Sequence, residues 1–331
     1  MRLLQIQKPG VGRRVAIVED SRIQLLGGID SVYSLAQMAL RSNQRLQTTA
    51  EKHASHKYLE YEEIYQGRSE WKILPAMDHP EEAARCLVTG TGLTHTKSAQ
   101  NRQAMHAADA TLTDSMRMYQ WGVEGGRPAA GRAGISPEWF FKGCGIILRG
   151  HGESLCVPPS AEDGGEEPEI AGVYVIDRDG VPRRIGMAAG NEFSDHVFEQ
   201  KNYLYLAVSK LMPCAIGPEL VLDPDFRSVS GEVSIEREGE VLWQRTVRTG
   251  EATMSHSLAN IEHHHFKHLA HRRPGDVHIH FFGADAFSFG EGIRLKDGDV
   301  MQIQFDGFGR ALCNPVQVDR STQPLVTTSP L

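Results

Sequence analysis

The sequence predicts an α+β protein in which a mixed β body carries a small N-terminal domain. The chain has 331 residues, enough for one large or two modest domains. Its 33 glycines and 16 prolines are typical of a protein rich in turns and short strands, and a hydrophobic content of 40% permits a sizeable core. These values exclude a helical bundle and a disordered chain.

The N-terminal part shows first a strand pattern and then a helical pattern. Apolar and polar residues alternate over 2–26, as in antiparallel strands joined by turns. Ser31 is a candidate N-cap for a helix over 32–40, where apolar residues recur at helical spacing. A second, more polar helix is expected over 50–65. We therefore expect a small N-terminal α+β domain over residues 1–82.

The remaining residues, 83–331, have the pattern of a larger, mixed-β body. Short apolar segments at 146–148, 170–176 and 277–282 are separated by glycine-rich turns, which is typical of strands. An acidic, glycine-rich stretch at 161–169 leads directly into the second of these segments. An acidic cluster is therefore expected at the start of a strand.

Composition and charge exclude several functional classes. The formal net charge of −7 leaves no large basic field that could hold a nucleic-acid backbone. The five cysteines form no C-x-x-C pair, so neither a disulfide framework nor a thiolate zinc site is expected, and a reducing cytosol is indicated. No run of about 18 apolar residues exists, and the N-terminus shows no export signal. We therefore expect a cytoplasmic protein that acts on small molecules.

Glu167-Pro168-Glu169, at the start of the strand over 170–176, is the strongest local feature. Because side chains alternate along a strand, both carboxylates are expected on one face and Pro168 on the other. Two neighbouring carboxylates need a cation, and oxygen ligands suit a hard divalent ion such as Mg²⁺ or Mn²⁺. A solvated acidic turn would explain the same residues, so the spacing alone leaves both interpretations open.

Several motifs in a fixed order decide between them. The chain reads E-P-E-I-A-G-V-Y-V-I, then a hairpin, then N-E-F-S-D-H-V and S-K before C-A-I-G-P; P-E-W-F-F-K precedes this core, and R-P-G-D-V-H-I-H-F-F-G-A and L-K-D-G-D-V-M-Q-I follow it. Over about Cys86 to Val316, this order resembles the fumarylacetoacetate hydrolase superfamily, in particular its 2-keto-3-deoxy sugar-acid dehydratases. The resemblance implies a β-sandwich or β-roll catalytic body over 83–331.

The resemblance also implies a metal centre. Glu167 and Glu169 match two metal carboxylates, and Glu192 stands where the family usually has an aspartate as third ligand. The longer side chain of Glu192 leaves Asp195, three residues later, as an alternative ligand. His196 stands where relatives typically carry arginine, so a different anchor for the substrate carboxylate is expected.

Catalytic and substrate-binding roles follow from the same matches. Lys210 corresponds to the active-site lysine of the dehydratases, and Glu138 corresponds to a second acid or base. His95 lies in a loop where hydrolases of the superfamily often have an H-x-x-E pair, but Ser98 stands in place of the glutamate. A hydrolase is therefore less well matched than a dehydratase. The substrate-binding residues implied are Lys142, Ser98, His196 and Gly283.

A histidine-rich segment over 256–271 offers a competing metal site. On one continuous helix, His264, His268 and His271 would share a face and could bind zinc. The segment has no H-E-x-x-H pattern, so buried or interface histidines are the preferred interpretation.

Taken together, these matches predict a lyase that depends on Mg²⁺ or Mn²⁺ and removes water from a 2-keto-3-deoxy sugar acid. The substrate expected is 2-keto-3-deoxy-L-arabonate, the product 2-oxoglutarate semialdehyde, and the setting pentose catabolism by a cytoplasmic homodimer. A metal-dependent hydrolase of 2,4-diketo acids that uses His95 to activate water is an alternative. A non-catalytic sugar-acid binding protein is another, because the changes at Glu192 and His196 are also consistent with lost activity.

Overall fold

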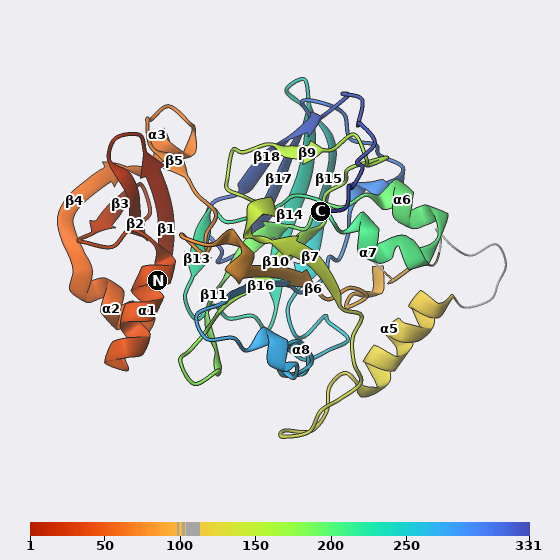
Figure 1. Ribbon diagram of the computed structural model, residues 1–331, viewed down its shortest axis with the longest axis horizontal. Helices are drawn as coiled ribbons and strands as arrows, with labels where there is room; N and C mark the ends of the chain where they lie inside the picture. The colour runs from red at the N-terminus through yellow and green to blue at the C-terminus, as the bar shows by residue number, and fades with distance from the viewer. Residues whose placement is uncertain (98, 101–102, 104–112) are drawn as a thin grey trace.

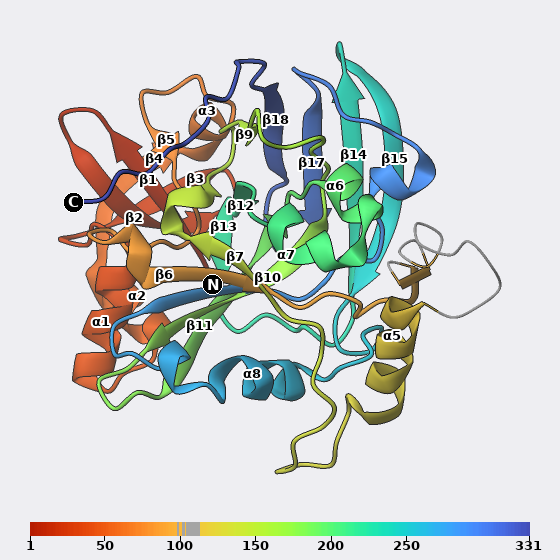
Figure 2. The same ribbon diagram turned by 45° about the vertical axis from the view of Figure 1, so that its right-hand side comes forward.

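The computed structural model describes residues 1–97, 99–100, 103 and 113–331, and two β-sheets form its centre (Figure 1). Short helices lie around these sheets, with α5 and α8 on the outside of the body (Figure 2). In the described part of the chain the larger sheet has 13 strands, in a main order β4-β3-β2-β1-β13-β11-β10-β16-β6-β7. The smaller sheet has the order β15-β14-β17-β18-β9. Mixed sheets with few helices agree with the α+β prediction, while the sandwich or roll description stays a prediction.

The larger sheet contains strands from the N-terminal, middle and C-terminal parts of the chain. Those of the larger sheet are β1 (Arg2–Lys8), β2 (Gly12–Glu19), β3 (Arg22–Leu26), β4 (Ala54–Glu60), β5 (Lys72–Ile73), β6 (Cys86–Gly90), β7 (Phe140–Cys144), β8 (Leu148–Arg149), β10 (Pro168–Ile176), β11 (Pro182–Asn191), β12 (Cys214–Ile216), β13 (Glu219–Val221) and β16 (Val277–Phe281). Those of the smaller sheet are β9 (Leu155–Val157), β14 (Val229–Arg237), β15 (Glu240–Thr249), β17 (Val300–Phe305) and β18 (Leu312–Val318).

The helices are short, and several begin at side-chain caps. The α-helices in the described residues are α1 (Val32–Ser42), α2 (Leu46–His53), α3 (Tyr61–Tyr65), α5 (Asp114–Gly125), α6 (His196–Lys201), α7 (Leu206–Ser209) and α8 (Leu258–Phe266). The 3-10 turns are η1 (Ala83–Arg85), η2 (Gly145–Ile147), η3 (Tyr203–Tyr205), η4 (Leu269–His271) and η5 (Ser288–Glu291). None of the helices in the described ranges has the length and hydropathy needed to span a bilayer.

Apolar side chains from both sheets pack together in one core cluster. Ile170 and Met187 from the larger sheet pack with Val233, Met301 and Ile303 from the smaller one. A second cluster places Val32 and Leu35 of α1 against Val173 and Ile279 of the larger sheet. Burial of these side chains from both directions therefore fixes the position of the central strands β10 and β16.

The N-terminal predictions are mostly confirmed. Strands β1 to β3 occupy the alternating stretch, and Ser31 caps α1 with a capping box shared with Ser34. The single helix expected over 50–65 is wrong, because β4 lies between α2 and α3 and pairs with β3 at the sheet edge. Sheet pairing outweighs the polar, helix-compatible composition there.

The first strands join the same sheet as the body. β1 pairs antiparallel with β13 through Arg2 opposite Val221 and Leu4 opposite Glu219. Buried Glu219 also accepts hydrogen bonds from Arg2 and from the Tyr61 hydroxyl. The backbone is therefore hydrogen-bonded across the boundary expected at residues 82 and 83, and the division into two domains stays a prediction.

Candidate active site

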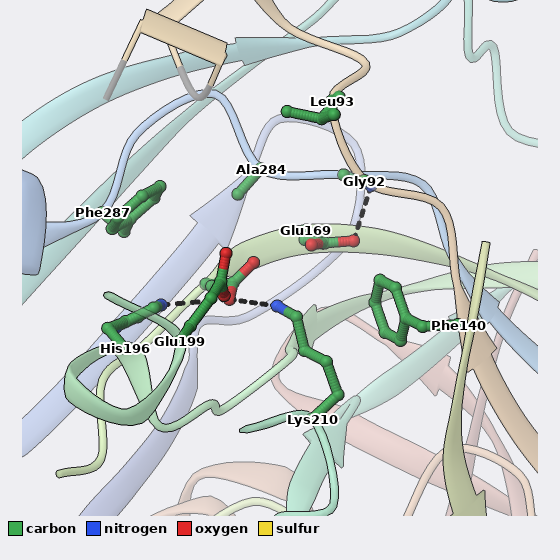
Figure 3. A pocket seen from close by; sticks show the side chains of 11 residues that line it. Gly92, Leu93, Phe140, Glu169, His196, Glu199, Lys210, Ala284 and Phe287 are labelled. Atoms are coloured by element: carbon green, nitrogen blue, oxygen red, sulfur yellow. Dashed lines mark hydrogen bonds and ion pairs between the residues drawn. The ribbon is translucent and has the colours of Figure 1, made fainter. Parts of the chain in front are cut away.

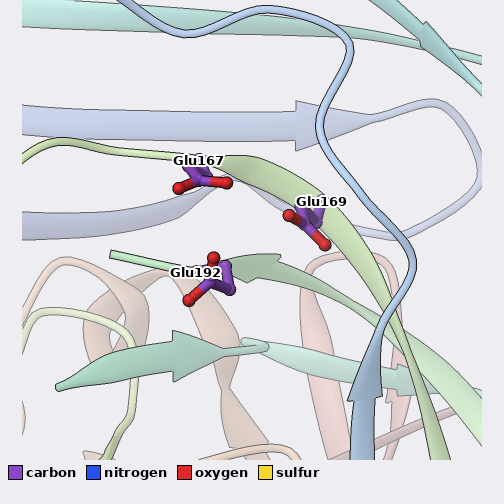
Figure 4. Close-up of side chains that lie close together, drawn as sticks. All are labelled: Glu167, Glu169 and Glu192. Carbon is purple, nitrogen blue, oxygen red and sulfur yellow. The ribbon is translucent and has the colours of Figure 1, made fainter. Parts of the chain in front are cut away.

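The antiparallel hairpin of β10 and β11 brings three glutamates together. Pro168 pairs with Asn191 at the open end of the hairpin, and Glu192 N donates to Glu167 O at 2.9 Å. Glu192 therefore lies opposite Glu167, while Glu169 lies two residues further along the same strand. Figure 4 shows the three carboxylates pointing toward one another. Their ligand atoms all lie within 4.8 Å of one another, and each residue is buried.

The alternative ligand, Asp195, has a different task. Its Oδ1 accepts the backbone N–H of Phe198 at 2.9 Å and caps α6. Its Oδ2 accepts the backbone N–H of Glu162 at 2.8 Å. Both oxygens are therefore engaged with the backbone, and the residue that converges with Glu167 and Glu169 is Glu192.

Lys210 and His196 approach the carboxylate of Glu167 from two opposite sides (Figure 3). The Lys210 ammonium donates to Glu167, to Glu192 Oε2 at 2.6 Å and to Ser194 Oγ at 3.0 Å. His196 Nε2 lies 3.0 Å from Glu167 Oε1, and its ring stacks on Phe287. Burial raises the pKa of Glu167, but Lys210 and His196 outweigh burial and lower that pKa well below its usual value.

Glu169 is in the opposite electrostatic situation. Its Oε2 accepts the backbone N–H of Gly283 at 2.6 Å. Burial, together with the charges of Glu192 and Glu167, raises the pKa of Glu169 well above its usual value. The positive groups of the protein therefore do not balance the charge of an ionised Glu169, and a bound cation would stabilise that ionised form. Three converging oxygen donors with this deficit fit a hard divalent cation such as Mg²⁺ or Mn²⁺.

The pocket around this cluster has apolar walls. Its lining residues come from the loop after β6, from β7, from the start of β10, from α6, from the end of α7 and from the loop after β16. They are Gly92, Leu93, Phe140, Glu167, Glu169, His196, Glu199, Lys210, Gly283, Ala284 and Phe287. Five of the residues expected at the site are therefore brought together here: Glu167, Glu169, His196, Lys210 and Gly283. Gly283 has φ +97°, and a Cβ there would lie 2.0 Å from Thr94 Oγ1. A side chain at this position would therefore disturb the loop that holds Gly92 and Leu93.

The carboxylate of Glu138 lies against Gly92, a residue that lines this pocket. A Cβ on Gly92 would lie 2.0 Å from Glu138 Oε1, so the glycine permits this close approach. Glu138 is buried and also lines a second cavity, with Met118, Trp121 and Tyr203. It therefore lies between that cavity and the pocket that contains Lys210.

The remaining expected residues behave differently. His95 is buried, and Thr94, whose hydroxyl donates to Phe282 O at 2.8 Å, accepts from His95 Nδ1 at 2.9 Å. Burial lowers the pKa of His95 to about 4, so its ring is neutral near pH 7. Ser98 lies outside the described residues. Lys142 is fully buried beside Glu192 rather than at the pocket wall.

Two buried glutamates of the site were not anticipated. Glu199 lines the pocket from α6, one helical turn after Asp195, and only that i, i+4 spacing after the N-E-F-S-D motif could have indicated it. Glu166 accepts from Ser288 N at 2.6 Å and from Ser288 Oγ at 2.8 Å. Burial raises its pKa. Glu166 therefore fastens the chain just before the metal carboxylates to the loop after β16.

The zinc alternative in the histidine-rich segment is not supported. α8 ends at Phe266 and η4 follows, so His264, His268 and His271 do not share one helical face. Among the described residues, the three glutamates form the one group whose donor atoms could hold a metal ion. Instead, His265, His278 and His280, here called the histidine cluster, are buried beside α8 and β16.

Hydrogen bonds set the tautomers of the histidine cluster. Trp139 Nε1 donates to His265 Nδ1 at 3.2 Å, so the proton of neutral His265 is on Nε2. This Nε2–H donates to His278 Nδ1 at 2.9 Å. His280 lies between Thr89 Oγ1 and Thr91 Oγ1, each at 2.7 Å. Burial lowers the pKa of His278 and His280 to about 3 and that of His265 well below its usual value. The cluster is therefore neutral near pH 7.

Comparisons with known proteins agree with the motif-based resemblance at the level of the fold. No model of a known protein family matches the chain, and no curated protein matches its sequence. A solved structure of 2-keto-3-deoxy-D-arabinonate dehydratase, complexed with magnesium and 2,5-dioxopentanoate, has a TM-score of 0.71 at 23% identity and covers 97% of this chain and 100% of its own.

More distant structures have the same overall arrangement. The 5-carboxymethyl-2-hydroxymuconate delta-isomerase from Mycobacterium smegmatis has a TM-score of 0.58 at 17% identity, covering 97% of this chain and 100% of that chain. The 2-hydroxyhepta-2,4-diene-1,7-dioate isomerase from Mycobacterium marinum gives the same values. The chain therefore has the fold of these solved structures, in particular that of 2-keto-3-deoxy-D-arabinonate dehydratase, as the motif-based resemblance predicts.

Proposed function

We propose that this protein is a divalent-metal-dependent dehydratase of a 2-keto-3-deoxy sugar acid. The substrate proposed is 2-keto-3-deoxy-L-arabonate, and the product is 2-oxoglutarate semialdehyde, also called 2,5-dioxopentanoate. The dehydratase that shares the fold is complexed with magnesium and this same compound. That dehydratase is described for the D-arabinonate series, so both configurations at C4 belong in any assay.

The carboxylates of Glu167, Glu169 and Glu192 would hold the ion. When bound, Mg²⁺ or Mn²⁺ supplies Lewis acidity to the carboxylate and 2-oxo groups of the substrate, which makes the C3 protons more acidic. Lys210, whose Nζ lies at the pocket beside Glu167 and Glu192, removes a proton from C3. Glu138, behind Gly92, protonates the C4 hydroxyl as it leaves as water. The resulting 5-hydroxy-2-oxopent-3-enoate then becomes 2,5-dioxopentanoate by a proton shift from C5 to C3 and ketonisation of the C4–C5 enol.

The position of Lys210 is the observation that carries this proposal. Its Nζ contacts two of the three candidate metal ligands and lines the same pocket as the third. A base that acts next to a coordinated 2-oxo acid must lie within reach of the ion's ligands, and Lys210 meets this requirement. His196 and the aromatic rings of Phe140 and Phe287 line the same pocket.

The hydrolase alternative depends on His95 instead. In that reaction His95 activates water, and Lys210 only holds the enolate. Gly92 and Leu93 from the His95 loop line the pocket, as Lys210 does, whereas the His95 ring is buried and hydrogen-bonded to Thr94. The geometry therefore favours Lys210 as the principal base.

Two variants on one substrate separate the two reactions. We expect Lys210→Ala to lose on the order of 10²-fold or more in turnover, measured as semialdehyde formation with Mg²⁺, because the C3 base is lost. His95→Ala is expected to lose less, since dehydration consumes no activated water. A severe defect in His95→Ala beside a mild one in Lys210→Ala would falsify the dehydratase proposal and favour the hydrolase.

Further parts of the proposal concern assembly and setting. We propose a cytoplasmic homodimer that acts in pentose catabolism, with a domain boundary at residues 82 and 83. These statements stay predictions.

A further inference from the structure

We propose that Lys142 is a positioning residue that orients Glu192 as the third metal ligand and fixes the backbone of Lys210 against it. The resemblance implied that Lys142 binds substrate. The contacts of its ammonium group point to a different role. This inference rests on the proposed metal centre but not on the identity of the substrate.

Lys142 and Phe140 share the inner side of β7. Side chains alternate along a strand, and burial alternates with them: Phe140 and Lys142 are buried while Phe141 is 44% exposed. Phe140 lines the pocket, and its ring lies 5.0 Å from Lys210 Nζ. Lys142, two residues further along, extends behind the pocket toward Glu192.

The Lys142 ammonium has three partners, all of them within the protein. Nζ donates to Phe193 O at 2.5 Å and to Lys210 O at 3.0 Å, and it forms an ion pair with Glu192 Oε1 at 2.5 Å. An ammonium group has three protons, so these three contacts use its full donor capacity. Both Lys142 and Glu192 have fully buried side chains. A substrate group could bind Lys142 only by displacing one of these contacts.

Glu192 is therefore held from two directions. Its Oε1 faces Lys142 at 2.5 Å, and its Oε2 faces Lys210 at 2.6 Å on the pocket side. Ser194 Oγ lies 3.2 Å from each oxygen and steadies the carboxylate plane. The pairing behind the carboxylate leaves Oε2 on the side of Lys210, whose ammonium also contacts Glu167. This is the arrangement by which an outer-shell partner fixes a ligand's orientation.

The same ammonium also fixes the candidate base. The carbonyl oxygens of Phe193, next to Glu192, and of Lys210 both accept from Lys142. One buried cation thus joins the segment after β11 to the end of α7. Lys142 consequently fixes the position of Glu192, the third ligand, relative to Lys210, the candidate base.

Metal affinity tests this role without any substrate. We expect Lys142→Met, which removes the charge and all three donors, to weaken Mn²⁺ binding in calorimetric titration by about 10- to 100-fold, the usual effect of losing an outer-shell partner. Lys142→Gln keeps a shorter donor without the charge and should weaken binding less. It also serves as the second variant if Lys142→Met does not fold.

Arg237→Met is the matched control. Arg237 pairs with the buried carboxylate of Asp299 in the five-stranded sheet, with two contacts of 2.8 Å. Its loss should lower the unfolding midpoint and leave the Mn²⁺ dissociation constant unchanged. If a Lys142 variant folds and binds Mn²⁺ as tightly as the wild type, the positioning role is wrong.

Kinetics then separate positioning from substrate binding. In the positioning role, the turnover lost in Lys142→Gln recovers as the Mn²⁺ concentration is raised, and KM for the keto acid stays near the wild-type value. A raised KM at saturating Mn²⁺ would show substrate binding and overturn the inference. Wild-type protein that binds Mn²⁺ but dehydrates no 2-keto-3-deoxy acid contradicts only the proposed function. Wild-type protein that binds no Mn²⁺ contradicts both.

Discussion

The glutamate site and the histidine cluster are both buried polar regions of the larger sheet, but they treat charge in opposite ways. At the glutamate site, three carboxylates face two buried lysines, and opposite charges lie within hydrogen-bonding distance. In the histidine cluster, His265, His278 and His280 are neutral; His265 contacts Trp139 and His278, and His280 contacts two threonine hydroxyls, while His278 Nε2 is buried without a hydrogen-bond partner among the described residues.

The difference lies in the cost of burial. A buried ionised group needs a partner of opposite charge, whereas a buried imidazole can give up its proton at little cost near pH 7. Neutral histidines therefore serve as interior packing and hydrogen-bonding groups. A buried excess carboxylate must instead take up a proton, which the raised pKa of Glu169 favours, or bind a cation. The two regions should accordingly respond differently to substitution, metal and pH.

The largest expected effect is at Glu169. Because its pKa is raised by burial and by neighbouring carboxylates, Glu169→Gln removes an unfavourable buried charge from the metal-free protein. We expect the metal-free unfolding midpoint to stay equal or rise, while the metal-induced increase in that midpoint disappears and turnover falls on the order of 10²-fold or more.

Thermal unfolding with and without Mg²⁺, followed by an activity assay, measures all three quantities. A structural role alone would lower the metal-free midpoint and keep the increase caused by Mg²⁺. That result would remove Glu169 from the candidate metal centre.

The histidine cluster should respond to pH in a predictable direction. His278 and His280 have pKa values of about 3 in the folded protein, below their ordinary value of 6.5. The unfolded chain therefore binds more protons below pH 6.5, so stability is complete above about pH 7 and falls as the pH decreases toward 3. At about pH 5 each histidine should cost about 2 kcal/mol of unfolding free energy.

Urea unfolding at about pH 7.5 and about pH 5 checks this expectation, with His278→Gln as the comparison. The variant cannot take up a proton at this position, so its loss of stability between the two pH values should be smaller by about 2 kcal/mol. An unchanged difference would mean that His278 has nearly the same pKa in the folded protein as in the unfolded chain.

The smallest effect is expected at the edge of the histidine cluster. Trp139 Nε1 donates to His265 Nδ1 at 3.2 Å. Trp139→Phe keeps an aromatic ring but leaves that buried acceptor without its donor, which should cost about 1 kcal/mol in urea unfolding. Mn²⁺ affinity should not change, and a clear weakening would show that the two polar regions are coupled.

Local pattern in the sequence was sufficient for several elements. The alternation over 2–26 predicts β1 to β3, and the hydroxyl of Ser31 predicts the start of α1. The Glu167-Pro168-Glu169 spacing places both carboxylates on one side of β10, and the ordered motifs add Glu192 and Lys210. The predictions of β1 to β3, of the start of α1 and of the shared side of Glu167 and Glu169 agree with the structure because strand period and capping depend on neighbouring residues alone.

Tertiary structure decided what local pattern could not. Pairing with β3 makes 54–60 a strand, although its composition also suits a helix. Capping of α6 removes Asp195 from the candidate ligands, and the end of α8 at Phe266 separates the histidines expected on one face. Lys142 follows Phe140 by one strand period, yet only the approach of Glu192, Phe193 and Lys210 shows that its ammonium is fully used inside the protein. Partners that lie 50 to 68 residues away in the chain leave no signal in its local sequence, because folding alone brings them within bonding distance.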